Sequence, residues 1–124
     1  MTPYIEKRGA GFHMVSEAPG FRSREKILLK EGIDYQTGQI LGRETATGEY
    51  APVNLASETG LQTVAGVLWD GVNLTEATDP VEAAAHVRDC EVNGNEIIFP
   101  TGATSGNKLT IVAGLLPLGI VVRY

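Results

Sequence analysis

The sequence predicts a small, mainly β domain with one short C-terminal helix, preceded by a flexible N-terminal arm. The chain has 124 residues, a length typical of a single domain that can bury its own core. It contains 15 glycines, and its short apolar runs alternate with turn residues, a combination typical of β-rich folds. We expect residues 1–20 to form the arm and residues 21–124 to form the compact β domain.

Residues 27–50 are the stretch around which the predicted β domain is organised. Gly32, Gly38, Gly42 and Gly48 interrupt it every few residues. An interior glycine costs a helix about 1 kcal/mol relative to alanine, so this spacing favours short strands joined by turns. Gly38 ends a predicted turn, where it can adopt a positive φ without steric cost.

The first 20 residues have little periodicity and too few apolar residues to form a core of their own. Their isolated large apolar residues are typical of a segment that becomes ordered on a partner. The alternative is a terminus without a role. The arm is followed by the one concentrated basic stretch, residues 21–26. This stretch either contacts an acidic partner surface or is the solvated beginning of a strand.

The middle of the chain predicts further strands. Residues 64–68 form an apolar run interrupted by Gly66 and followed by Trp69, which we expect in the core. Residues 72–74 form another short strand. Residues 79–82 have the pattern of a helix start, whereas residues 87–92 have that of a strand, and composition alone leaves the choice open.

The last third predicts a hairpin, a helix and a final strand. Asn93-Gly94 is a hairpin signal, with residues 97–99 as the returning strand. Residues 108–116 form the predicted helix, with Ser105 as its cap. Its apolar residues at helical spacing are Leu109, Val112, Ala113 and Leu116. Residues 120–122 form a strand that ties the C-terminal end into a sheet.

Charge and composition argue against several classes of protein. A net charge of −5 disfavours a nucleic-acid-binding face, which must be basic. No apolar run approaches the roughly 20 residues that span a bilayer, and residues 1–13 lack the apolar segment of a secretory signal. We therefore expect no nucleic-acid partner, no membrane and synthesis in the cytoplasm. The single cysteine, Cys90, cannot form an intrachain disulfide.

The chain also lacks a recognisable catalytic or metal-binding pattern. Residues 102–108 resemble a phosphate-binding loop, but the lysine does not directly follow the second glycine as the motif requires. His86 and Cys90 are spaced for one helix face, yet a metal site needs a third ligand, and His13 lies in the predicted arm. We expect neither an enzyme nor a cofactor.

Several blocks of the sequence carry a resemblance to a known family. They are Ser-Arg-Glu at 23–25, Gly-Gln-Ile-Leu-Gly-Arg at 38–43, Ala-Gly-Val-Leu at 65–68, Glu-Val-Asn at 91–93 and Leu-Leu-Pro-Leu-Gly-Ile-Val-Val-Arg at 115–123. These blocks span nearly all of the predicted domain. Their order and spacing resemble those of the bacteriophage head decoration protein D family, the lambda-type capsid-stabilising proteins. The arm matches only in character.

The resemblance implies a homotrimer on the outer surface of an expanded phage head. It would bind the major capsid protein at local threefold positions and stabilise the head against internal DNA pressure. The family has no enzymatic activity and no cofactor, and its fold favours strand at 84–92 and a turn at 79–82. The candidate capsid-binding residues are the apolar Ile5, Phe12, Met14 and Phe21 and the basic Arg22 and Arg24. The competing hypotheses are a monomeric peptide- or carbohydrate-binding β module and a small enzyme subunit whose site forms between chains.

Overall fold

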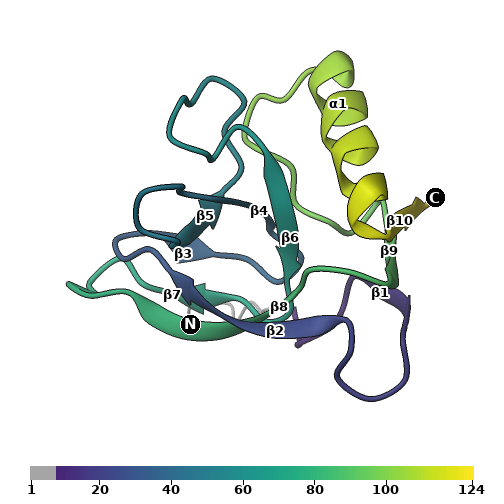
Figure 1. Ribbon diagram of the computed structural model, residues 1–124, viewed down its shortest axis with the longest axis horizontal. Helices are drawn as coiled ribbons and strands as arrows, with labels where there is room; N and C mark the ends of the chain where they lie inside the picture. The colour runs from purple at the N-terminus through teal and green to yellow at the C-terminus, as the bar shows by residue number, and fades with distance from the viewer. Residues whose placement is uncertain (1–7) are drawn as a thin grey trace, which may run out of the picture.

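A closed five-stranded β barrel forms the centre of the computed structural model, which describes residues 8–124 (Figure 1). Around the barrel the strand order is β2-β5-β4-β6-β8. The bounds are Arg24–Leu29 for β2, Ile40–Arg43 for β4, Tyr50–Pro52 for β5, Val64–Leu68 for β6 and Val81–His86 for β8. The predicted fold class, mainly β with one short C-terminal helix, is confirmed.

Glycines allow the barrel strands and turns to approach closely. Gly38 has a φ of +83° in the turn that precedes β4, as the sequence predicts. A Cβ atom on Gly66 of β6 would lie 2.7 Å from the carbonyl oxygen of His86 on β8. On β4, a Cβ atom on Gly42 would lie 2.6 Å from the carbonyl oxygen of Leu61. The predicted series of short strands between glycines is therefore correct.

The first and the last strand of the described chain belong to a second, three-stranded sheet. Its order is β1-β9-β10, with bounds Met14–Glu17 for β1, Cys90–Asn93 for β9 and Ile120–Arg123 for β10. Strand β1 is antiparallel to β9 and β10 is parallel to it. The last strand thus ties the C-terminal end into a sheet, as predicted. Strand β1 lies within residues 1–20, so the structure pairs part of the predicted arm with the domain.

The helix α1, Ser105–Leu115, packs beside β6 and β10 (Figure 1) and continues into the 3-10 turn η1, Leu116–Leu118. Its cap is Thr104, whose hydroxyl accepts a hydrogen bond from the backbone N–H of Asn107 at 3.1 Å, so the prediction of Ser105 as the cap is wrong. The helix therefore begins one turn earlier than predicted. A small two-stranded sheet, β3 (Asp34–Tyr35) and β7 (Val72–Asn73), completes the fold.

The predicted apolar face of α1 is also wrong. The residues that α1 buries are Ile111 and Leu115, whereas Leu109 and Leu116 are 72% and 62% exposed. Leu115 is next to the exposed Leu116 in the sequence, and Ile111 is two residues from the exposed Leu109. Because apolar residues lie on both faces of the helix, their periodicity does not show which face is buried. Close approach fixes the orientation, because a Cβ atom on Gly114 would lie 2.7 Å from Val64 Cγ2 on β6.

The structure settles the ambiguous segment between residues 79 and 93 as two strands. Strand β8 already includes Val81 and Glu82, so the predicted turn at 79–82 is wrong for these two residues. Asp89 has a φ of +50° and separates β8 from β9. The hairpin predicted at Asn93-Gly94 is wrong as well, because β9 pairs with β1 and β10, and Ile98 instead forms an isolated bridge with Gln39.

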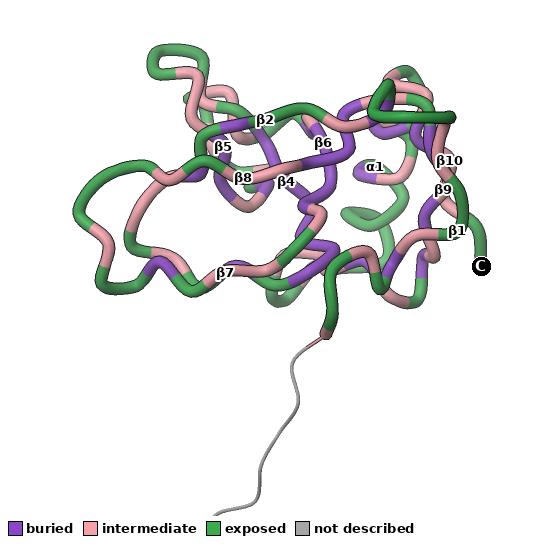
Figure 2. Tube along the Cα trace, turned by 90° about the horizontal axis from the view of Figure 1, so that it is seen from below, coloured by how far each residue is buried: buried purple, intermediate pink, exposed green. Residues whose placement is uncertain are grey.

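Two apolar clusters form the core, one inside the barrel and one between the barrel, the three-stranded sheet and α1 (Figure 2). The second cluster contains Ile111 and Leu115 of α1 and Ile120 of β10. Trp69, expected in the core, is only half-buried and lies outside both clusters. Within residues 8–124, no helix has the length and hydropathy needed to cross a membrane.

Candidate functional site

The segment that leads into β1 and the loop after it carry most of the predicted binding residues. Phe12 is 55% exposed and Phe21 is 80% exposed, so both rings are accessible to a partner. Met14 is half-buried and packs against the second core cluster. Ile5 lies outside the described residues. The structure therefore presents two of the four predicted apolar anchors at the surface.

The two predicted arginines differ in their availability to a partner. Arg22 has a side chain that is 66% exposed, and its Nε lies 3.6 Å from Asp89 Oδ2. Arg24, on β2, donates hydrogen bonds from Nη2 and Nε to the Glu17 carboxylate at 2.7 and 3.0 Å, and its guanidinium lies 3.7 Å from the centroid of the Trp69 ring. Arg24 therefore has a structural role within the chain, whereas Arg22 is accessible.

Glu17 connects β1 to the barrel. Its carboxylate accepts hydrogen bonds from Arg24 of β2 and interacts with Nε2 of His86 on β8. The hydrogen bonds from Arg24, and then the one from His86, lower the pKa of Glu17 to about 2. Glu17 is therefore ionised over the physiological pH range, and it links the edge strand β1 to two barrel strands.

Sequence reasoning missed a buried pair of histidines at the same place. His13 and His86 are both fully buried, with ring centroids 6.3 Å apart and nearly perpendicular rings. Burial is the main cause that lowers the pKa of both, that of His13 to about 4. Assigning residues 1–20 to a separate arm excluded His13 from any site, and no spacing in the sequence indicates that residues 73 positions apart meet.

Gly11 closes the contact between the N-terminal segment and the barrel. Its φ is +72°, and its N–H donates a 2.9 Å hydrogen bond to the carbonyl oxygen of Trp69. A Cβ atom at this position would lie 2.4 Å from Cη2 of the Trp69 ring. Glycine is therefore required for the backbone to lie directly over the indole. The segment from Gly11 to β1 is part of the folded domain.

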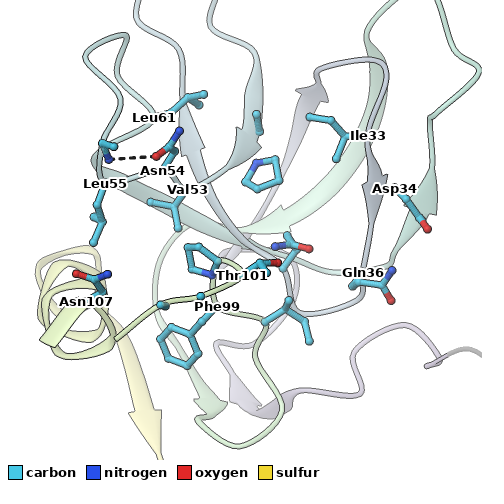
Figure 3. Close-up of a pocket in the computed structure, with 18 of the residues that line it drawn as sticks. Ile33, Asp34, Gln36, Val53, Asn54, Leu55, Leu61, Phe99, Thr101 and Asn107 are labelled. Carbon is cyan, nitrogen blue, oxygen red and sulfur yellow. Dashed lines mark hydrogen bonds between the residues drawn. The ribbon is translucent and has the colours of Figure 1, made fainter. Parts of the chain in front are cut away.

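A groove of about 1030 Å³ lies on another part of the molecule, between α1, the loop after β5 and β3 (Figure 3). Val53 and Asn54 contribute to its lining from the loop after β5, and Asn107 contributes from α1 (Figure 3). Its ionisable lining residues are Lys30 and Asp34, and Lys30 already pairs with Glu44 at 2.7 Å. The lining thus offers mixed polar and apolar contacts but no acid–base pair.

The structure does not assemble a metal site from the residues it describes. Within 8–124, no three or more histidine, cysteine, aspartate or glutamate side chains are grouped in a way that could hold an ion. His86 and Cys90 lie on different strands, β8 and β9, rather than on one helix face. Burial raises the pKa of the Cys90 thiol to about 12, so the thiol does not ionise near neutral pH.

Comparison with known families identifies the chain. The model of the family described as bacteriophage lambda head decoration protein D matches residues 3–120. The chain belongs to this family. The match extends over the segment before β1, the barrel, α1 and the start of β10. A search of curated proteins finds no match.

Membership in the head decoration family supports a role in decorating a phage capsid. It implies a place on the outside of the phage head and binding to the capsid. Decoration proteins of this family are structural rather than enzymatic. Phe12, which precedes β1, and Phe21 and Arg22, which follow it, are exposed and are therefore candidates for capsid contact.

Proposed function

We propose that this decoration protein binds the major capsid protein as a homotrimer at the local threefold positions of the expanded head. There it stabilises the shell against the pressure of packaged DNA, without a nucleic-acid or membrane partner. The observation that carries the proposal is the family match over residues 3–120, because it includes the N-terminal segment as well as the domain. The exposed Phe12 and Phe21 support a capsid contact near β1.

The position of β1 supports attachment by strand pairing. In the three-stranded sheet β1 is an edge strand, with β9 as its partner on one side. The backbone groups of an edge strand can pair with a strand from another chain. The N-terminal segment enters the domain directly at this edge, so a capsid strand that pairs with the segment would lie close to the exposed Phe12.

Energetics favour several arms acting together. Ordering eight residues of a flexible arm costs on the order of 10 kcal/mol, at 1–2 kcal/mol per residue. Strand pairing and burial of the apolar anchors must exceed this cost, so one arm binds weakly. In a trimer the second and third arms bind at a high effective concentration, and the symmetry of the trimer matches the local threefold axes of the shell.

Binding to several shell subunits at once explains how decoration stabilises the head. A trimer that bridges neighbouring subunits adds contacts that must break before the shell can rupture. If the contact surface exists only in the expanded shell, binding shifts the population towards that state. The proposed anchors are Ile5, Phe12, Met14 and Phe21, with Arg22 as a contact to acidic capsid residues. Arg24, the other basic candidate, is already held by Glu17 and Trp69. Among them the exposed Phe21 and Arg22 are the most accessible.

Truncation of the arm tests this mechanism. Removing residues 2–9 retains Gly11, His13 and β1, which are packed on the domain, whereas removing all of 1–19 would also delete β1. We expect the truncated protein to fold and to keep the solution mass of three chains, but to lose co-sedimentation with expanded empty heads. Undiminished binding by the truncated protein would show that the arm does not attach it.

Point variants test the surface around β1. Phe21→Ala and Arg22→Glu are expected to weaken co-sedimentation with expanded heads. The matched controls lie on α1: Leu109→Ala removes an exposed apolar side chain, and Lys108→Glu reverses the charge of an exposed cation. Equal weakening by both sets would show that the contact is not located at Phe21 and Arg22.

The groove between α1 and the loop after β5 favours one alternative, a monomeric module that binds a peptide or carbohydrate. Solution mass distinguishes the two functions. About three chain masses by analytical ultracentrifugation supports decoration by a trimer, and one chain mass at millimolar concentration supports the module. Solution mass does not separate the enzyme subunit from the decoration trimer, because a site formed between chains also needs an oligomer. That hypothesis would require a deep intersubunit pocket lined by His86 and carboxylates.

A further inference from the structure

We propose that the seam between the N-terminal segment and the barrel is a proton-sensitive latch. His13 and His86 are the residues that respond to pH. Their protonation releases residues 8–17, while the barrel stays folded. The proposal does not depend on capsid binding. It follows from three features of the seam: two buried imidazoles, three of their four ring nitrogens without a hydrogen-bond partner within residues 8–124, and cationic neighbours.

His13 is buried in surroundings that favour a neutral ring. Its side chain is fully buried, and among residues 8–124 neither ring nitrogen has a hydrogen-bond partner. The backbone around it is fixed, because the His13 carbonyl oxygen accepts a 2.8 Å hydrogen bond from the N–H of Asn93. A Cβ atom on Gly38 would lie 3.1 Å from His13 Cγ, so the turn before β4 packs against the ring. A second proton on this ring would therefore lack both solvent and an acceptor.

His86 forms the barrel side of the latch. Its ring lies 5.2 Å from the Trp69 ring and is fully buried on β8. Nε2 interacts with the Glu17 carboxylate, whereas Nδ1 has no partner within the described chain. Glu17 is itself held by Arg24. One histidine therefore belongs to the segment and one to the barrel, and a charge on either ring acts across the boundary between them.

The charged groups around the two rings do not offer His13 a free carboxylate. They are Arg8 from the N-terminal segment, Glu96 from the loop after β9, Glu17 from β1 and Arg24 from β2. Both carboxylates are already paired, Glu96 with Arg8 at 3.0 Å and Glu17 with Arg24 at 2.7 Å. The charges of His86 and Arg8 add to burial in lowering the pKa of His13.

The direction of the pH effect follows from the lowered pKa. Burial takes the pKa of His13 from 6.5 to about 4 in the docked state. The released segment therefore binds more protons between these values, and docking weakens as the pH falls through this window. For His13 alone, the docking equilibrium falls about 20-fold from pH 7 to pH 5 with these two pKa values. His86 changes the equilibrium in the same direction, because burial outweighs its interaction with Glu17.

Composition confines this response to the seam. The chain contains 2 histidines, and both lie in the latch. Histidine is the side chain whose ordinary pKa falls between pH 5 and pH 8. The interior of the barrel is apolar, so mild acid does not introduce a charge there. Partial release of the segment, rather than unfolding of the domain, is therefore the expected response to a pH near 5.

Hydrogen exchange on the full chain tests the latch at pH 7 and pH 5, with rates corrected for the intrinsic effect of pH. The reporting amides are those of Gly11, Met14 and Asn93, which bond across or within the seam. Those of Val53 and Leu68 report on the barrel. We expect protection of the seam amides to fall about 20-fold while the barrel amides keep theirs. Unchanged seam protection, or an equal loss in the barrel, would overturn the proposal.

Substitution assigns the effect to the ring. In His13→Phe no hydrogen bond is lost, because the ring nitrogens have no partner among the described residues. We expect it to keep seam protection and to reduce the pH dependence to less than about 3-fold. The control Val15→Ala, at an exposed residue of β1, should respond to pH as the unaltered protein does. A full pH response in His13→Phe would contradict the latch.

A measurement on the unaltered protein decides the matter if His13→Phe does not fold. The two imidazoles can be titrated by NMR in the full chain, and each is assigned from the sequence positions of its neighbours. A His13 pKa below 5 supports the latch. A His13 pKa of 6 or above shows that the ring is not constrained by its surroundings and overturns it.

Discussion

The reversed face of α1 gives a direct test, because a buried and an exposed leucine are neighbours in the sequence. Leu115 is fully buried in the cluster between the barrel and α1, and Leu116 is 62% exposed. Leu115→Ala removes buried methyl groups and leaves a cavity, which costs 2–5 kcal/mol in comparable cores, so we take about 3 kcal/mol. Leu116→Ala is expected to change the free energy of unfolding by less than about 0.5 kcal/mol.

Thermal and urea unfolding measure this difference. An unfolding entropy of about 2.1 cal/mol/K per residue gives about 0.26 kcal/mol/K for a chain of this length, so Leu115→Ala lowers Tm by about 12 °C. The measurement is made at two protein concentrations, because association adds a concentration-dependent contribution to Tm. Equal losses for the two variants at the lower concentration, or a larger loss for Leu116→Ala, would refute the assignment of the buried face.

Three further predictions concern the seam and the core. Gly11→Ala is expected to cost about 1–3 kcal/mol, since it combines a positive φ with a clash against Trp69, and to change the tryptophan emission. The control Gly9→Ala, with open space around it, should change neither. Glu17→Gln should lower the free energy of unfolding at pH 7, measured by urea titration. At pH 2 the variant and the unaltered protein should have similar free energies of unfolding. The reason is that the lowered pKa of Glu17 contributes stability above pH 4.5, and this stability is lost as the pH falls to about 2. Cys90 should resist an aromatic disulfide reagent at pH 8 in the folded protein and react once urea unfolds it; rapid reaction of the folded protein would contradict its burial.

Local chemistry made most of the barrel predictable. Glycine spacing located the strands around Gly38 and Gly42, because few backbone conformations suit a chain so interrupted. Strand β6 was predictable from its apolar run despite Gly66. These features depend on neighbours within a few residues, and such neighbours are visible in the sequence.

Features that depend on distant partners were not predictable. The pairing of β9 with β1 and β10, rather than with residues 97–99, depends on strands from both ends of the chain. The buried face of α1 depends on which side meets Val64. The contact between His13 and His86 joins segments that no periodicity connects. Sequence patterns specify which residues can be buried, and the partner determines which of them are.

The predicted binding residues illustrate the same difference. Arg22 and Arg24 are equivalent in the sequence, as two cations in one basic stretch. In the structure the guanidinium of Arg24 is bonded to Glu17 and lies over the Trp69 ring, whereas Arg22 remains largely exposed. Only the folded arrangement distinguishes a residue that holds the domain together from one that is open to a partner.

The central position of β9 has a consequence for biosynthesis. The ribosome makes Met14 long before it makes Cys90, and β10 follows β9 in the sequence. The nascent strand β1 therefore has no native partner until β9 has been made, and the sheet closes only after β10 has followed. Such long-range closure slows folding, and a chain that stops a few residues early would leave both β9 and the helix without their last neighbour.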